Sequence, residues 1–474
     1  MGGISDAIAR ILFGLAVFAV LAAAILTRPA KWLNDFDQVF YITIAYDLRH
    51  HGVFTNGHVL RGVGNWEVNS RVAAPPPGMF FAPLYPWLVV AATEIDPRFA
   101  RAADCIVEAD QGAHSDTECE LYARPVHLIH ALLLALGVLA IAAAGEAVFA
   151  RRGVFWLGGV LATAALLTEA DLFSFVMTES LTFFLYGVAA LALVRALKAP
   201  RPGRVALAGA LLALVCLART SFAVLLPVVA ALILVNGVWL VRSGWRPAAR
   251  LGLVFVLAWL ATVSPWLIRN AVSVGRFGLT EEYGAATLVE RLAFDDMSAR
   301  EFALAFPYCV PVIGAPLVDG AFGPDAMQRF VYDAPGSFFI TGRTLRDQLV
   351  AAHGRLDPLI LGLFLDELRE KGWRYLLASV PLGWCGMWVG DLFALLMVPL
   401  FAWATVAAAR AKPLFLLYAA PPLAMLALHA ALANQFTRYN LVLIGPFSAG
   451  AAWVLLTLAA GLTQRGFFAR RQAA

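Results

Sequence analysis

Two carboxylates stand close together directly after the first hydrophobic stretch of the chain. Asp35 and Asp37 follow residues 8–27, which are largely apolar. An acidic group at the boundary between lipid and water is costly to keep there, so such groups usually have a function. Both acids are therefore candidates for the chemistry of this chain. The alternative for Asp37 is structural, because Asn34 would cap a helix in which Asp37 is the third residue.

The residues after the two acids predict the helix that positions them. Apolar side chains recur there at helical spacing: Phe36, Phe40, Tyr41, Ile44 and Leu48. This spacing is typical of an amphipathic helix with one face moored at a membrane surface. The pattern ends at Gly52, a residue type that commonly terminates helices.

Other polar side chains stand at the ends of apolar segments, on the side of the membrane that carries the two acids. They are Glu179, Arg219, Arg269, Asn270, Arg438 and Tyr439. A charge at the centre of a membrane helix costs about 2.5–3.5 kcal/mol, so their gathering at helix ends predicts a site near the outer leaflet. The structural alternatives are snorkelling for Arg269, a paired or protonated core residue for Glu179, and an interface pair for Arg438 with its neighbouring tyrosine.

The composition identifies the class of protein that carries these residues. Of 474 residues, 61% are hydrophobic and 14% charged, against about 45–50% and 25% in soluble domains. A membrane-spanning helix needs about 20 mostly apolar residues. The chain is therefore expected to be an all-α polytopic membrane protein with about ten spans. Their predicted positions are 8–27, 125–149, 154–170, 175–195, 205–218, 222–241, 251–268, 386–409, 413–433 and 440–463.

Arginine and lysine residues cluster in the loops that one side of such a bundle would carry. Arg10 lies at the start of the first predicted span, and cations follow the second, fourth, sixth, eighth and tenth spans. Positive residues mark the cytoplasmic side, so both termini are predicted to be cytoplasmic. Two long segments, 28–124 and 269–384, then face the exterior, with interfacial helices expected at 79–92 and 363–377. No linker divides the chain, so residues 1–474 are predicted to form a single domain.

Several classes of function lack support in the sequence. The net charge is only +4, and no basic patch indicates nucleic-acid binding. The chain has no G-x-x-x-x-G-K-S/T motif, so ATP-driven transport has no support. No pair among the five cysteines has the C-x-x-C spacing of a zinc site. Cys105 and Cys119 share the first long segment, where a disulfide bond and two free thiols are both open.

The stretch that begins at Asp37 resembles a motif of the GT-C fold glycosyltransferases, the relatives of protein O-mannosyltransferases and of the lipid A aminoarabinose transferase. The family motif reads D-E-x-x-Y, and this chain has Gln38 in place of the glutamate. Four further pieces follow in the family's order: 77–86, which ends in Pro-Leu-Tyr-Pro, 178–181, Pro265 to Asn270 with 275–277, and Arg438 with Tyr439. The resemblance covers the first seven predicted spans well and the C-terminal third poorly.

This resemblance implies an inverting enzyme that moves a sugar from a polyprenyl phosphate to an acceptor hydroxyl on the external face. In the family the aspartate matching Asp37 is the proposed general base, a role that a positioned carboxylate can perform. Asp35 would orient the acceptor or simply be solvated. Cations stabilise the phosphate that leaves, and the candidates are Arg438 with Tyr439, Arg269 and Arg219. The candidate substrate-binding residues are Glu179, Tyr41, Tyr85 and Asn270.

The partners expected from this reading are the lipid-linked sugar, the bilayer, and an acceptor that is a lipid, a polysaccharide or a protein. Asp35 and Asp37 together are also a candidate site for a divalent cation, because hard cations prefer oxygen ligands. The Ala-, Leu- and Arg-rich composition favours a bacterial inner membrane.

Two other functions remain open. One is a secondary transporter or a lipid-linked sugar flippase that performs no glycosyl transfer. Transporters often contain internal repeats and polar residues near the bilayer midplane, whereas the polar groups here gather at one boundary and no repeat is visible. The other is a non-enzymatic scaffold in which the acids only cap helices, which leaves their clustering unexplained.

Overall fold

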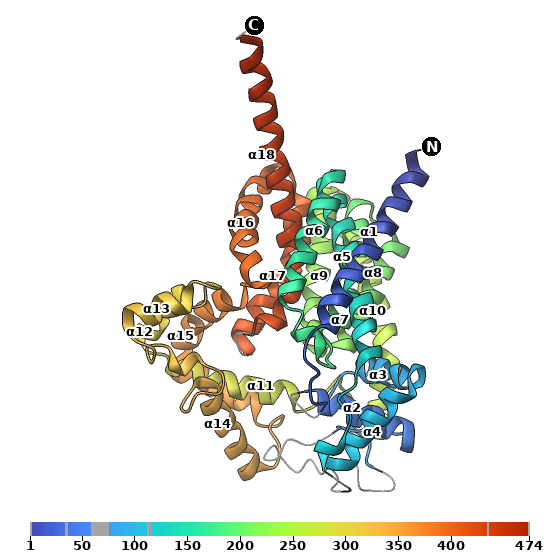
Figure 1. Ribbon diagram of the computed structural model, residues 1–474, viewed down its shortest axis with the longest axis vertical. Coiled ribbons are helices and arrows are strands. Elements are labelled where there is room, and N and C mark those ends of the chain that lie inside the picture. The colour runs from blue at the N-terminus through green and yellow to red at the C-terminus, as the bar shows by residue number, and fades with distance from the viewer. Residues whose placement is uncertain are drawn as a thin grey trace.

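The part of the chain that the structure describes is helical and contains no β-strand. The computed structural model describes residues 2–33, 37–57, 75–110, 113, 115–433 and 436–472. Figure 1 shows an upright bundle of long helices, with shorter helices below it and to one side. Both termini lie at the upper end of the bundle, away from the shorter helices. The prediction of an all-α fold is confirmed.

Eight helical segments of the described chain are long and apolar enough to cross a membrane. Five of them lie within single helices: α1 (Gly2–Leu26), α5 (Arg124–Phe149), α7 (Glu179–Lys198), α10 (Trp245–Ser273) and α17 (Pro413–Leu432). Each of the other three combines consecutive helical elements. The first consists of η4 (Thr220–Val224), α9 (Leu225–Val235) and η5 (Asn236–Leu240), and the second of η8 (Asp391–Phe393) and α16 (Ala394–Ala411). The third consists of η9 (Thr437–Leu443) and the first part of α18 (Ile444–Gln472). Their length and apolar composition are those of an α-helical polytopic membrane protein.

Two shorter apolar helices correspond to the other two predicted spans. They are α6 (Arg152–Thr168) and α8 (Pro202–Ala218), each of 17 residues. Both belong to the bundle, because α6 packs against α5 and α18 and α8 packs against α7 and α10. Since they are shorter than the other spans, the total of about ten stays a prediction.

The start of the eighth predicted span is wrong by several residues. Residues from 360 to Gly386 form one helix, α15 (Ile360–Gly386), and the next span starts only at Asp391. Gly390 adopts a positive φ of 89°, which glycine tolerates without a Cβ clash. The chain turns there, so an apolar run that is continuous in the sequence is divided between two helices.

Three short helices cover the lower end of the bundle: α2 (Gln38–His51), α3 (Leu84–Ile95) and α4 (Pro97–Asp110). The first of them differs from its prediction in two ways. It begins at Gln38, so Asp37 is the N-cap residue rather than the third residue, and its side chain makes no capping hydrogen bond. In addition, residues 38–45 are all buried, because α3 and α4 pack on a helix expected to expose one face.

The second long segment, residues 269–384, folds beside the bundle (Figure 1). Its helices are α11 (Tyr283–Leu292), η6 (Ala293–Asp296), α12 (Ala299–Tyr308), α13 (Gly314–Phe322), η7 (Gln328–Phe330), α14 (Phe338–His353) and α15. A cluster of phenylalanines forms a small core of its own: Phe294, Phe330, Phe338 and Phe339. The interfacial helix predicted at 363–377 is part of α15, which kinks at Lys371.

Arg291 joins this segment to the bundle. The side chain is fully buried, and its guanidinium donates four hydrogen bonds. Two of them reach the carbonyl oxygen of Ala430 in α17 at 3.1 Å and Oδ1 of Asp295 at 2.8 Å. The other two go to the carbonyl oxygen of Tyr375 and to Oγ of Ser379 in α15. The side chain of Arg291, which belongs to α11, thus links η6, α15 and α17.

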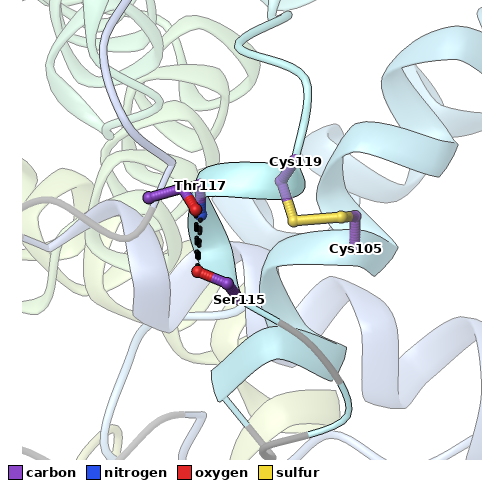
Figure 2. The surroundings of a disulfide bond; sticks show 4 residues. All are labelled: Cys105, Ser115, Thr117 and Cys119. Carbon is purple, nitrogen blue, oxygen red and sulfur yellow. Dashed lines mark hydrogen bonds between the residues drawn. A yellow bond between two sulfur atoms is a disulfide. The ribbon is translucent and has the colours of Figure 1, made fainter.

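Two disulfide bonds are present, and Cys216 is a buried free thiol. The bond between Cys105 and Cys119 ties α4 to the end of η2 (Asp116–Glu118), in which the backbone N–H of Thr117 donates to Oγ of the N-cap residue Ser115 (Figure 2). This resolves the alternatives left open for that pair. The bond between Cys309 and Cys385 joins the end of α12 to the end of α15. The sequence did not suggest it, since 76 residues separate the two cysteines.

Thiol counting on denatured protein is expected to find one reactive thiol per chain before reduction and five after it. The one thiol is that of Cys216, which burial protects in the folded protein. The Cys216→Ser variant is the matched control, and it should contain no thiol before reduction. A count of three in the unmodified chain would show that one of the disulfide bonds does not form.

Candidate functional site

A small cavity brings together residues from distant parts of the chain at the lower end of the bundle. Its lining includes Asp37, Tyr41, Glu179, Arg219 and Tyr439. All five were candidates from the sequence, and the fold gathers them from α2, α7, the end of α8 and η9. The cavity holds about 30 Å³, which suits a hydroxyl group or a water molecule rather than a whole sugar.

Three of the charged side chains that line this cavity lie at the ends of helices. Asp37 is the N-cap residue of α2, Glu179 is the first residue of α7, and Arg219 directly follows the last residue of α8. A carboxylate is favoured at a helix N-terminus and a cation at a C-terminus, because of the partial charges on unpaired backbone groups. Arg438 and Tyr439 lie in η9, next to a break in helical geometry at Asn440.

Two ion pairs dominate the electrostatics. Nη2 of Arg438 lies 3.3 Å from Oδ2 of Asp37, and Nη1 of Arg219 lies 3.6 Å from Oε1 of Glu179. Arg438 does not line this cavity, but its guanidinium contacts Asp37 and Tyr439, which do. The other carboxylate oxygen of Glu179, Oε2, is buried and accepts no hydrogen bond from the described residues. The site therefore has two cations near its two acids and spare acceptor capacity.

Aromatic side chains hold the cations in place. The guanidinium of Arg219 lies 4.5 Å from the centre of the Tyr439 ring, and that of Arg438 lies 5.3 Å from it. Such contacts favour a cation over the ring face. Tyr41 and Tyr283 complete the wall. Burial raises the pKa of both tyrosine hydroxyls above their usual value, so both stay protonated and can donate hydrogen bonds.

A second cavity of about 420 Å³ adjoins the first and shares part of its wall. The shared residues are Arg219, Thr220, Tyr283 and Tyr439. The rest of its wall includes five aliphatic side chains, together with Ser221, Thr280, Thr287 and His429: Leu279, Leu288, Leu428, Leu432 and Ala433. The volume is in the range of cavities that bind small molecules. Together the two cavities run from a charged end to an apolar end.

His429 presents a hydrogen-bond acceptor to the larger cavity. Its Nδ1 lies 2.9 Å from Oδ1 of Asn440, whose Nδ2 donates to the carbonyl oxygen of Gly386. Since Oδ1 can only accept, Nδ1 of His429 must carry the proton, which leaves Nε2 as an acceptor in the neutral ring. The imidazole is 5% exposed, so its orientation is fixed by packing and by this hydrogen bond.

Besides Arg438, three described candidates from the sequence do not line either cavity. Tyr85 is fully buried beside Tyr41, and its hydroxyl lies 2.9 Å from Nε2 of His130. Arg269 and Asn270 form a clamp between loops. These contacts give Tyr85, Arg269 and Asn270 a structural role, which explains the presence of the three residues in the motif without a contact to substrate.

The clamp at the end of α10 is extensive. Arg269 donates hydrogen bonds to the carbonyl oxygens of Gly78 and Phe54 in the first long segment. Asn270 is fully buried and donates to the carbonyl oxygen of Gly278 at 2.8 Å. The ring nitrogen of Trp266 donates to the carbonyl oxygen of Leu279. The clamp therefore fixes the two long segments to one another next to the cavities.

Asp35 lies outside the described residues, so the divalent-cation site expected from the two acids stays a prediction. Within the residues that the structure does describe, no group of three or more His, Cys, Asp or Glu side chains is placed to hold a metal ion.

The sequence missed Tyr283 and His429. Tyr283 lies in α11, in a segment that matches no motif, and only the folded chain brings it opposite Asp37. His429 is isolated from other candidate residues in the sequence, so it was interpreted as a packed or hydrogen-bonded histidine. The structure shows that hydrogen bond, and it also shows that His429 lines the larger cavity. His429 lies near the end of the span predicted at 413–433, which was a hint, whereas no predicted helix end lies near Tyr283.

Comparison of the chain with protein-family models and with curated proteins gives no match.

Proposed function

We propose that this protein is a membrane glycosyltransferase that moves a sugar from a polyprenyl-phosphate donor to an acceptor hydroxyl, with Asp37 as general base. The observation that supports this best is the pair of adjoining cavities. Two carboxylates line the small cavity, the guanidinium of Arg219 lies at the junction, and the larger cavity has several aliphatic side chains in its wall. A phosphate-linked lipid has a charged group between a sugar and an apolar chain, which matches this order.

The reaction would use each group in turn. The acceptor hydroxyl lies in the small cavity and gives its proton to the Asp37 carboxylate as its oxygen bonds to the anomeric carbon of the sugar. The bond between that carbon and the phosphate oxygen breaks on the opposite face, and its electron pair stays on the phosphate. Inversion follows from attack opposite the leaving group. Polyprenyl phosphate leaves, and Asp37 later returns its proton to water.

Arg219 and Arg438 would stabilise the phosphate. Arg219 lies at the junction of the two cavities, and Arg438 contacts Tyr439 there. Each guanidinium now pairs with a carboxylate, so an incoming phosphate can take over either cation. If Arg438 turns toward the phosphate, Asp37 is released to act on the acceptor. Positioned cations of this kind stabilise developing negative charge in a transition state.

The proposed location follows from charge and from cysteine chemistry. The basic loops favour a cytoplasmic location of both termini, and both termini lie at the same end of the bundle (Figure 1). Three of the four disulfide-bonded cysteines lie in the long segments assigned to the other side, and Cys385 directly follows the second segment. Disulfide bonds persist in oxidising compartments. The site would thus face the periplasm or exterior of a bacterial inner membrane.

The Arg438→Ala variant is expected to weaken donor binding more than it slows the chemical step. Removing one charge-assisted contact to a phosphate should raise the dissociation constant by about 10- to 100-fold, since such bonds contribute about 1.5–3 kcal/mol. Donor binding by the purified protein and single-turnover rates at saturating donor separate the two effects. The Arg98→Ala variant is the control, because Arg98 pairs with Glu120 away from both cavities. Unchanged donor affinity would remove Arg438 from the site.

The experiment that tests the function is a turnover assay in lipid nanodiscs with a panel of polyprenyl-phosphate sugars. Release of free polyprenyl phosphate is measured with the unmodified protein and with the Asp37→Asn variant. Release that depends on Asp37 is the expected result. Donor binding without release, even with lipid, polysaccharide and protein acceptors supplied, would favour a carrier or flippase instead. Absence of binding to every donor would contradict the proposal.

A further inference from the structure

A third cavity, separate from the two described above, has a basic lining. It holds about 300 Å³ and lies where the lower ends of α1 and α5 meet. Its lining includes the cations Arg28, Lys31 and Arg124, together with His127 and Gln38. No aspartate or glutamate among the described residues lines it. It also adjoins the N-terminus of α5, where unpaired backbone N–H groups add partial positive charge.

Two of the three cations have no acidic partner among the described residues. Lys31 pairs with Asp171 at 2.9 Å and lies over the ring of Phe175. Arg28 and Arg124 are exposed, and neither is in an ion pair within that part of the chain. By contrast, the nearby Arg49 pairs with Asp104 at 2.7 Å. The basic cavity therefore holds positive charge that no acidic side chain among the described residues neutralises.

The position of these cations is unusual for a membrane protein of the proposed topology. Arginine and lysine next to membrane spans are favoured on the cytoplasmic side. Arg28 follows the first span and Arg124 begins the second, both at the end assigned to the exterior. The three cations work against the charge pattern that orients the chain, so their presence calls for an explanation other than topology.

We propose that the basic cavity binds the phosphate group of an anionic membrane lipid. A lipid suits the place better than a soluble anion, because the cavity is at the end of two membrane spans and Leu26 and Leu33 form part of its wall. Along α1, whose last residue Leu26 lines the cavity, the large side chains of Leu12, Leu15 and Val20 are exposed and offer a surface for acyl chains. Basic pockets between membrane helices are a known way to hold lipid head groups.

Gln38 connects the basic cavity to the proposed reaction site. Its side chain lines the basic cavity, while the preceding residue, Asp37, lines the small reaction cavity. The Gln38 amide donates to the carbonyl oxygen of Trp32 and accepts from the backbone N–H of Val176. A lipid bound in the basic cavity would thus adjoin Gln38, the residue that follows the proposed general base Asp37 in the chain. The lipid-binding proposal does not depend on glycosyl transfer and is tested without it.

The test is native mass spectrometry of the full-length protein in detergent, titrated with phosphatidylglycerol or with phosphatidylcholine of the same acyl chains. Preference for phosphatidylglycerol is the expected result. The double variant Arg28→Gln/Arg124→Gln should bind phosphatidylglycerol on the order of 25-fold more weakly, with about a 5-fold loss for each cation near a membrane surface. Arg374→Gln is the matched control, since Arg374 is exposed and lines none of the three cavities.

Three results would overturn the lipid proposal. One is equal binding of phosphatidylglycerol by the unmodified protein and the double variant. Another is the same loss of binding in Arg374→Gln, which would indicate general surface charge. The third is displacement of the lipid by millimolar inorganic phosphate, which would assign the cavity to a soluble anion. If the double variant does not fold, each single variant should still bind phosphatidylglycerol about 5-fold more weakly, and an unchanged affinity in both would count against the proposal.

Discussion

Replacement of Asp37 by asparagine is expected to abolish glycosyl transfer while leaving the fold intact. A general base contributes about 10²- to 10⁴-fold to a rate, and an amide cannot accept the proton. The stability of the protein should change little, because the Asp37 side chain makes no capping hydrogen bond. Its ion pair with Arg438 is partly exposed, and such pairs contribute about 0–1 kcal/mol.

Turnover and thermal unfolding of the Asp37→Asn variant check this together. The matched control is Asp391→Asn, which removes an exposed carboxylate at another helix start, outside the two reaction cavities. The control should retain turnover. A large loss of stability in Asp37→Asn would show that the carboxylate serves the fold, and unaltered turnover would exclude it as the base.

Replacement of Arg291 by methionine should cause a large loss of stability. The substitution removes four hydrogen bonds and leaves Asp295 buried without its cation. Burial already raises the pKa of Asp295 to about 6. Breaking a buried ion pair by removing one partner costs about 3–5 kcal/mol. Arg291→Lys should also be destabilising, since an ammonium group cannot reproduce the planar arrangement of N–H donors in a guanidinium group.

The unfolding midpoint in detergent and the rate of limited proteolysis within residues 269–384 measure the effect. Arg300→Met is the control, because Arg300 is an exposed arginine of the same segment. It should behave like the unmodified protein. Equal midpoints for Arg291→Met and Arg300→Met would mean that the buried arginine does not hold the segment to α17.

Much of the bundle was predictable from the sequence, because long apolar runs have few alternatives in a membrane. The eight segments of the described chain that are long and apolar enough to cross a membrane all correspond to predicted spans. Prediction failed where tertiary packing decides the outcome. The helix after Asp37 was expected to expose one face, but α3 and α4 cover it. The start of the eighth span moved because Gly390 turns the chain within an apolar run.

The candidate site was only partly predictable, for a similar reason. Helix-end charges such as Glu179 and Arg219 can be identified from their place in the chain, and these two do meet in the cavity. Arg269 has the same sequence character, yet its guanidinium is used in binding loop carbonyl groups. Sequence position tells which charges lie at a boundary, but only the fold shows which of them have protein partners.

The order of the disulfide bonds has a consequence for biogenesis. Cys105 pairs with Cys119 and Cys309 with Cys385, while Cys216 between them is buried in α8. In the proposed topology each partner is the next cysteine to reach the oxidising side during membrane insertion. Oxidation in the order of emergence then yields the native pairs directly. The chain should therefore mature with a thiol oxidase alone, without a disulfide isomerase to correct it.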